Sequence, residues 1–141
     1  MTRLEPRWVP RVVVEAVQLD QVREHGGLLG LRDEDALEAA LARARQRWTY
    51  DPDSDLPRLA ACYAFGICSG HPFRDGNKRI SFLTALIFLG LNGLDLVAPE
   101  AEVAGKMWAL AAGELDEEAI ADWFRSRIEL PAPVKRGKRR R

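Results

Sequence analysis

The sequence RISFLTALIFLGLN, from Arg79 to Asn92, carries the strongest structural signal in the chain. Its apolar residues fall on every side of a helical wheel, and a helix that is apolar all round has to be buried. The most apolar block within it, Leu83 to Leu91, is too short to span a bilayer. We therefore expect one buried central helix, ended by Asn92 and Gly93, with the rest of a helical domain packed around it.

Amphipathic segments of ordinary helix length flank this run on both sides. Asp33 and Asp116 are of the residue type that caps a helix N-terminus, and Gly70 is of the type that ends a helix. The turn-rich residues 48–56 predict an exposed loop or a short β-hairpin. The expected fold class is all-α, a compact bundle around one buried helix with a short hairpin beside it. Its flanking helices are predicted over residues 12–24, 34–47, 57–70, 102–112 and 117–128.

Length and composition indicate one ordinary globular domain. The chain has 141 residues and 15.8 kDa, with 47% hydrophobic and 30% charged residues. These values exclude a multidomain assembly, a disordered chain, collagen and a disulfide miniprotein. Residues 1–130 are predicted to form the domain, and residues 131–141 a disordered basic tail.

The charge is unevenly distributed although Lys plus Arg and Asp plus Glu are both 21. Six of the positive residues lie in the tail, so the rest of the chain is acidic. An acidic body makes a poor general nucleic-acid binder, because phosphate neutralisation dominates that kind of affinity. The tail alone could make a weak contact with RNA, although a charge run of this kind is more often a solvated extension.

The cysteines and the N-terminus predict a cytoplasmic protein without membrane contact. Cys62 and Cys68 lie six residues apart in an apolar stretch, which fits two buried free thiols and neither a zinc site nor a disulfide framework. Arg3, Glu5 and Arg7 stand where a signal peptide would need an apolar run.

The residues that carry chemistry are those from Gly70 to Arg79, GHPFRDGNKR, which join two predicted helices. The residue before a proline avoids the α region, so His71 has to leave the first helix, and Gly76 provides a tight turn into the next. A helix N-terminus presents free amides and a positive dipole end. Followed by Lys78 and Arg79, such a turn predicts an anion site of the kind that holds phosphate.

Two more side chains of this stretch suit phosphate chemistry. Asp75 supplies an oxygen ligand of the type that Mg²⁺ prefers, and His71 can take a proton from an attacking hydroxyl near neutral pH. Phe73 is expected to anchor the loop in the core. A capped and solvated turn would contain the same residue types, so these residues alone predict a phosphate site without naming a reaction.

The run from His71 to Arg79 resembles the signature of the Fic/Doc (Fido) family, His-x-Phe-x-Asp/Glu-Gly/Ala-Asn-Lys/Gly-Arg. The similarity extends over about residues 12–127 and includes Gly26-Gly27 and Asn92-Gly93, which resemble the death-on-curing, or Doc-type, branch. The resemblance implies a Fic/Doc domain over residues 1–130. It also implies an ATP-dependent enzyme that modifies a protein hydroxyl with the help of Mg²⁺.

The family roles transfer to this sequence position by position. By this resemblance, His71 is the catalytic base, Asp75 the Mg²⁺ carboxylate and Phe73 the structural anchor. The anion-binding turn for the phosphates of ATP comprises Gly76, Asn77, Lys78 and Arg79. The flap that aligns a target peptide corresponds, more loosely, to Gln46, Arg47, Trp48, Thr49 and Tyr50.

Lys78 separates two reactions within the family. Most relatives have glycine there and transfer AMP, whereas a lysine resembles the Doc toxins, which transfer the γ-phosphate of ATP as protein kinases. Phe82 in place of a second arginine supports the Doc branch, while Pro72 and Gly76 follow the Fic form. A kinase is therefore the first expectation and a protein AMP transferase (adenylyltransferase) the alternative. A non-catalytic module that binds an anion or RNA is a second alternative.

The Doc resemblance also implies partners. The target would be elongation factor Tu, with arrest of translation as the outcome. No stretch of the chain matches the inhibitory motif Ser/Thr-x-x-x-Glu-Gly/Asn of AMP-transferring relatives, so inhibition is expected from a separate Phd-like antitoxin. Gln18 stands where Doc relatives often have histidine.

Overall fold

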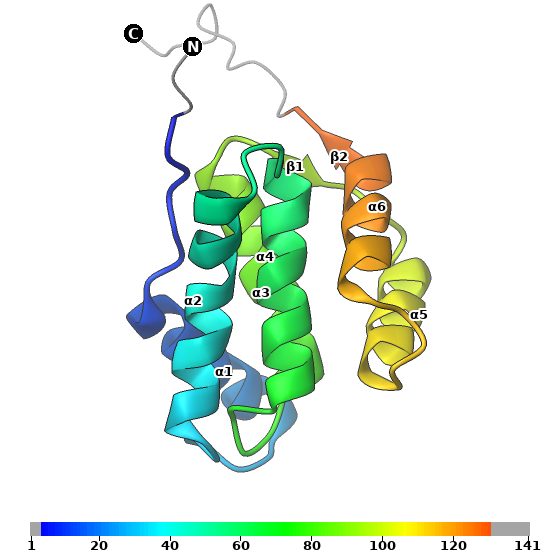
Figure 1. The fold of residues 1–141 in the computed structure, drawn as a ribbon. Coiled ribbons are helices and arrows are strands. Elements are labelled where there is room, and N and C mark those ends of the chain that lie inside the picture. The colour runs from blue at the N-terminus through cyan, green and yellow to red at the C-terminus, as the bar shows by residue number, and fades with distance from the viewer. Residues whose placement is uncertain (1–3, 131–141) are drawn as a thin grey trace, which may run out of the picture.

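The computed structural model describes residues 4–130 of the chain, so the predictions for the basic tail, residues 131–141, concern residues outside this range. The described part is an all-α bundle, which confirms the predicted fold class. In Figure 1, α3 and α4 lie between α2 on one side and α5 and α6 on the other. The helices are α1 Arg11–His25, α2 Glu34–Tyr50, α3 Leu56–Gly70, α4 Asn77–Leu91, α5 Glu100–Ala111 and α6 Glu117–Arg127.

The helix starts follow from short-range capping. The side chains of Asp33, Asp55 and Asp116 each accept a hydrogen bond from the backbone N–H three residues later, at 2.8–3.0 Å. Each bond satisfies an amide that has no partner inside the helix. The predicted caps at Asp33 and Asp116 are therefore confirmed, and the helix boundaries lie within three residues of the predicted ones.

The central helix is α3 rather than α4, which corrects the prediction made from the apolar run. Nine of the fifteen residues of α3 are buried, compared with six of fifteen in α4. Helix α3 packs against α2, α4, α5 and α6. Small residues allow this close packing: a Cβ on Gly66 would lie only 3.2 Å from the backbone of Ala40 in α2. A helical wheel that is apolar on all sides shows only that a helix is hydrophobic. How many helices can pack against it also depends on how small its side chains are.

Of the exposed loop or short hairpin predicted at residues 48–56, the hairpin is absent and the loop is shorter than predicted. Helix α2 continues to Tyr50, and only residues 51–55 separate it from α3. Arg47 pairs with Asp51 at 2.8 Å, one helical turn on, which supports the extra turn of α2. The Asp51 side chain then accepts a bond from Asp53 N–H, so the link closes as a tight turn.

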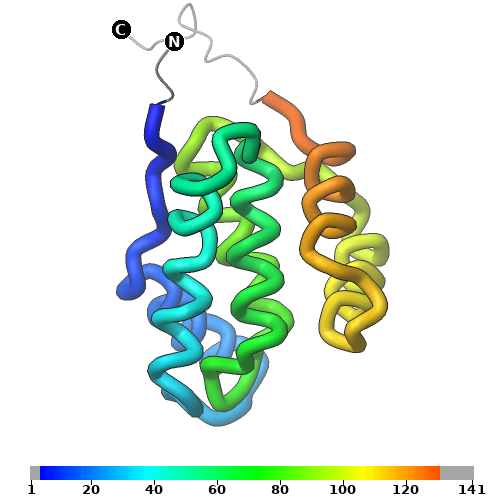
Figure 2. Tube along the Cα trace, in the orientation of Figure 1, coloured from blue at the N-terminus to red at the C-terminus, as the bar shows by residue number. Residues whose placement is uncertain are grey.

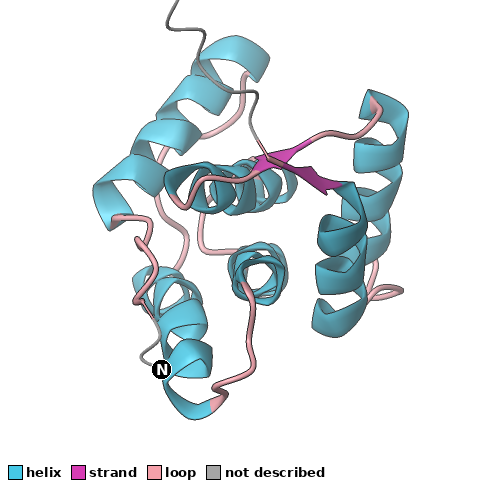
Figure 3. Cartoon of the chain, turned by 90° about the horizontal axis from the view of Figure 1, so that it is seen from above, coloured by secondary structure: helices cyan, strands magenta, loops and turns pink. Residues whose placement is uncertain are grey.

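The one small sheet within residues 4–130 lies elsewhere. Strand β1 (Asp95–Leu96) pairs antiparallel with β2 (Ile128–Glu129), and Figure 3 shows the pair in magenta. The pair fastens the end of α6 to the link between α4 and α5. Along the tube of Figure 2, α2 runs in one direction and α3 returns in the other, so the α3–α4 loop lies at the far end of α3 from the α2–α3 turn. No helix of the described residues is both long and apolar enough to cross a membrane.

Both cysteines are buried free thiols, as predicted. Burial, with the negative charge of Glu117 nearby, raises the pKa of Cys62 to about 11, and burial raises the pKa of Cys68 as well. At pH 8 only about one Cys62 side chain in 10³ would then be the reactive thiolate. We expect a thiol reagent to label the native protein slowly and to label two thiols at once in denaturant. Rapid labelling of the folded protein would contradict the packing of α3.

Candidate active site

The loop between α3 and α4, residues 71–76, begins with an unusual backbone conformation at His71. His71 has φ 48° and ψ 54°, and it is the one residue other than glycine with positive φ in the described chain. Arg32 stabilises this end of α3: its Nε donates to the His71 carbonyl at 2.6 Å and its Nη2 to the Gly70 carbonyl at 2.9 Å. His71 leaves the helix before Pro72, as predicted. Its side chain is exposed, and the backbone that carries it is fixed by Arg32.

Phe73 and Asn77 lock the loop from inside. The Phe73 side chain is 1% exposed and belongs to the core, which fits the predicted anchor. The Asn77 side chain accepts from Phe73 N–H at 3.0 Å and donates to the Phe73 carbonyl at 2.9 Å. Because both ends of this amide are engaged, Asn77 can contribute to an anion site through its backbone N–H.

A second segment, residues 26–33, runs along this loop and was not found by sequence reasoning. Leu31 and Phe73 form an isolated antiparallel bridge, and Arg74 N–H donates to the Gly30 carbonyl at 3.0 Å. The signal that could have found the pairing is the spacing of Gly26, Gly27 and Gly30, all of which have positive φ. We call residues 26–33 the glycine segment.

Asp75 lies where the loop and the glycine segment meet. Its Oδ2 accepts a 2.6 Å hydrogen bond from Leu28 N–H. A Cβ on Gly27 would come within 3.1 Å of the Asp75 side chain and would be strained at φ +107°, so glycine is favoured at this approach. The carboxylate is therefore held by the backbone of another segment rather than by a cationic side chain.

Helix α4 begins directly after Asp75. Gly76, with φ +86°, is its N-cap residue and provides no side-chain cap. The first amides of α4 thus have no capping side chain, and the basic residues Lys78 and Arg79 follow at once. A helix N-terminus with free amides and adjacent cations has the chemistry to bind an anion.

The loop and the start of α4 form one wall of a cleft of about 890 Å³, and α5 provides the opposite wall. Lys78 reaches across it, with its Nζ 4.1 Å from the centre of the Trp108 ring. The structure therefore brings together all the predicted residues of the motif except the buried Phe73. The cleft is lined on the motif side by His71, Arg74, Asp75, Gly76, Asn77, Lys78 and Arg79, and on the apolar side mainly by Phe82, Leu83, Val103, Ala104, Met107, Trp108 and Ala111.

The donor set of the cleft fits a metal held jointly with a phosphate ligand. No cluster of three or more His, Cys, Asp or Glu side chains suited to a metal occurs in residues 4–130. Asp75 and Glu100 are the carboxylates that line the cleft. Mg²⁺ commonly takes one or two carboxylates and fills its remaining positions with phosphate oxygens and water, which these residues allow.

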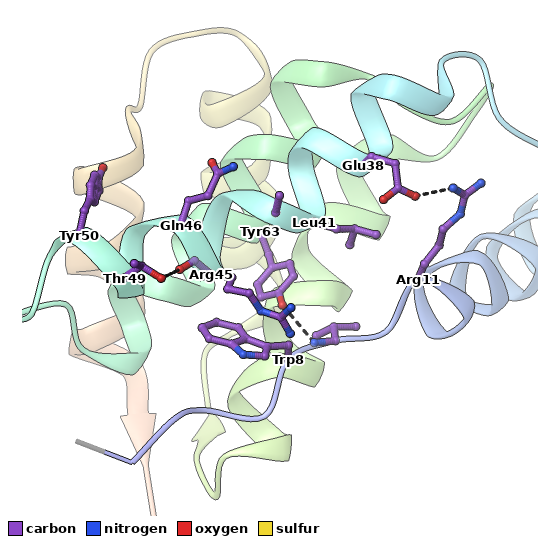
Figure 4. Close-up of a pocket in the computed structure, with 11 residues that line it drawn as sticks. Trp8, Arg11, Glu38, Leu41, Arg45, Gln46, Thr49, Tyr50 and Tyr63 are labelled. Carbon is purple, nitrogen blue, oxygen red and sulfur yellow. Dashed lines mark hydrogen bonds and ion pairs between the residues drawn. The ribbon is translucent and has the colours of Figure 1, made fainter. Parts of the chain in front are cut away.

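Residues 46–50, the predicted flap, do not lie beside the motif. They form the last turns of α2, at the opposite end of the α2–α3 pair from the loop that joins α3 to α4 (Figure 1). Gln46, Thr49 and Tyr50 line a different hollow of about 780 Å³, shown in Figure 4 with Trp8 and Tyr63. Arg47 contacts Asp51 and Glu117, and Trp48 contacts Trp8. The segment that adjoins the motif is the glycine segment.

Comparison with known proteins identifies relatives that share this region. A sequence model of the Fic/DOC family matches residues 8–89, from before α1 to near the end of α4. "Protein kinase doc" of Escherichia phage P1 is 35% identical over 104 residues, which cover 74% of this chain and 82% of that protein. "Toxin Doc" of Mycolicibacterium smegmatis is 41% identical over 76 residues, 52% of this chain and 57% of that protein.

Proposed function

This chain belongs to the Fic/Doc family, and we propose that it is a Doc-type toxin that acts as an ATP-dependent protein kinase. The observation that carries the proposal is the cleft, where a histidine, a carboxylate and a basic helix N-terminus face an apolar wall. The similarity to a relative named a protein kinase supports the same reaction. Lysine rather than glycine at position 78 favours transfer of the γ-phosphate over transfer of AMP.

The proposed reaction moves the γ-phosphate to a hydroxyl side chain of a protein. His71 accepts the hydroxyl proton as the target oxygen attacks the γ-phosphorus. The new bond joins that oxygen to phosphorus, the bond from phosphorus to the β,γ-bridging oxygen breaks, and ADP leaves with the electron pair. His71 can then return the proton to solvent.

The other residues of the cleft bind and orient the nucleotide. The first amides of α4, with Lys78 and Arg79, hold the γ-phosphate. The apolar wall on α5 takes the adenine base. Asp75 would hold Mg²⁺ together with the phosphate oxygens, and the bound ion would neutralise charge that develops on the phosphates.

The proposed partners follow the Doc resemblance. The target is elongation factor Tu, its modification arrests translation, and the site of action is the cytoplasm. A Phd-like antitoxin supplied in trans inhibits the toxin. A weak RNA contact of the basic tail is a secondary role that does not involve the cleft.

The test uses ATP labelled at the γ or the α phosphate, incubated with the purified protein, Mg²⁺ and elongation factor Tu or a bacterial lysate. We expect γ label alone on a protein band, with His71→Ala as the control. Transfer of α label would indicate an AMP transferase, and absence of any His71-dependent label would overturn the enzymatic proposal. RNA binding that persists in His71→Ala and is lost on removing residues 134–141 would then favour the binding module.

Nucleotide binding is expected to change the fluorescence of Trp108. The Trp108 side chain is 66% exposed at the cleft, and its ring is covered by the Lys78 ammonium. A phosphate that attracts Lys78, or a base that stacks on the ring, replaces this contact. A titration with a non-hydrolysable ATP analogue should alter the emission of the wild type and of Trp48→Phe, but not that of Trp108→Phe. If the emission of Trp108→Phe changed on titration as much as that of the wild type, the nucleotide would lie away from α5.

A further inference from the structure

Gln18 is a polar side chain of α1 that is buried but lies outside the hydrophobic core. It is 2% exposed, and its amide makes three hydrogen bonds outside its own helix. Its Oε1 accepts from Gly30 N–H at 2.9 Å, and its Nε2 donates to the Leu28 carbonyl at 3.0 Å. Nε2 also lies 3.4 Å from the Asp75 carbonyl oxygen. One side chain thus binds the glycine segment at two points and the motif loop at a third.

These bonds continue to the Asp75 carboxylate through the Leu28 backbone. Gln18 holds the Leu28 carbonyl, and the N–H of the same residue donates to Asp75 Oδ2 at 2.6 Å. The second carboxylate oxygen is left for the cleft that Asp75 lines. A rotation of the Leu28 backbone would break the bond to Oδ2 and release the carboxylate to turn.

Apolar packing contributes little to holding Leu28 and Leu29 in place, whereas Leu31 farther along the glycine segment packs against the core. Leu28 and Leu29 are 54% and 51% exposed, and glycines with positive φ lie on both sides of them. A segment with exposed side chains and flexible glycines gains its position mainly from polar contacts. The direction of the Asp75 carboxylate therefore depends on the buried amide of Gln18.

We propose that Gln18 is a positioning residue for the divalent metal that accompanies the nucleotide: through the Leu28 backbone it orients the Asp75 carboxylate toward the phosphates. The inference rests on the proposed function, because the metal role of Asp75 is part of it. Groups that orient a metal ligand commonly change metal affinity by 10–100-fold when they are removed. A residue that only stabilised α1 would have no such selective effect.

The experiment measures how strongly Mg²⁺ favours nucleotide binding, which does not require activity. The dissociation constant of a non-hydrolysable ATP analogue is determined by calorimetry with and without Mg²⁺ for each variant. Gln18→Met keeps the volume and removes the three hydrogen bonds. Val14→Ala, one turn earlier on α1 and fully buried, is the matched control for lost stability. Asp75→Ala provides the value expected when the metal ligand is absent.

We expect Gln18→Met to reduce the Mg²⁺-dependent gain in affinity by about tenfold, toward the Asp75→Ala value, with little change in metal-free binding. In the NMR spectrum of Gln18→Met, the resonance of the Leu28 amide proton should move upfield. The same proton should also exchange faster with solvent. Val14→Ala should keep both properties of the wild type. If Gln18→Met matches Val14→Ala while Asp75→Ala loses the gain, the role of Gln18 is overturned and the proposed function stands. If the wild type shows no Mg²⁺-dependent binding, both proposals fail.

Discussion

Replacing His71 with alanine is expected to slow phosphate transfer by about 10²–10⁴-fold, the usual effect of removing a general base. The substitution should leave the loop in place, because Arg32 binds the carbonyl oxygens of Gly70 and His71 and not the imidazole. Phe73 and Asn77 hold the other side of the loop through a pair of hydrogen bonds. The loss should therefore appear in the rate and not in nucleotide affinity.

The measurement is the initial rate of γ-label transfer at saturating ATP, combined with a nucleotide titration by calorimetry. His71→Ala should bind the ATP analogue within about threefold of the wild type, since the base acts mainly in the transition state. His25→Ala, which replaces the other histidine of the chain at the end of α1, should retain the full rate. A His71→Ala rate close to that of His25→Ala would mean that another group accepts the proton.

Local rules were enough to predict most of the secondary structure and the motif side of the cleft. An aspartate cap, a proline in a first turn and a glycine stop each act within a few residues, so the sequence displays them directly. The motif loop is a comparable case. The proline after His71 and the turn at Gly76 were sufficient to place the histidine, the carboxylate and the cations at one helix start.

Features that depend on distant contacts could not be predicted in this way. The pairing of Leu31 with Phe73 joins residues from separate loops, and no short-range pattern encodes it. Helix α5 forms a wall of the site because it packs against α4, and that packing is a long-range contact. The flap was mapped onto residues 46–50 only loosely, from the family resemblance, and in the fold these residues form the end of α2, away from the motif. The segment beside the motif contains glycines, and the sequence does not show that Gly27 packs against the Asp75 side chain.

Replacing Glu117 with glutamine is expected to lower the free energy of unfolding by about 3 kcal/mol, the lower end of the cost of breaking a buried ion pair. The Glu117 side chain is 10% exposed and pairs with Arg43, with Arg58 at 3.2 Å and with Arg47 at 3.9 Å. It is thus the shared counter-ion of guanidinium groups from both α2 and α3. Removing its charge leaves them close together without a shared counter-ion at a partly buried position.

Glu118→Gln is the matched control, because Glu118 is the exposed neighbour in the same first turn of α6. Both substitutions remove a favourable charge from the helix N-terminus, worth about 0.3–1 kcal/mol, so the difference between them isolates the arginine cluster. Urea unfolding should show the larger loss for Glu117→Gln, and adding Arg43→Gln should recover part of it because one repelling charge is gone. Equal losses of unfolding free energy in the two single variants would mean that solvent already screens the repulsion between the guanidinium groups. In that case α6 would be held to α3 by its apolar face, through Ile120, Ala121 and Phe124.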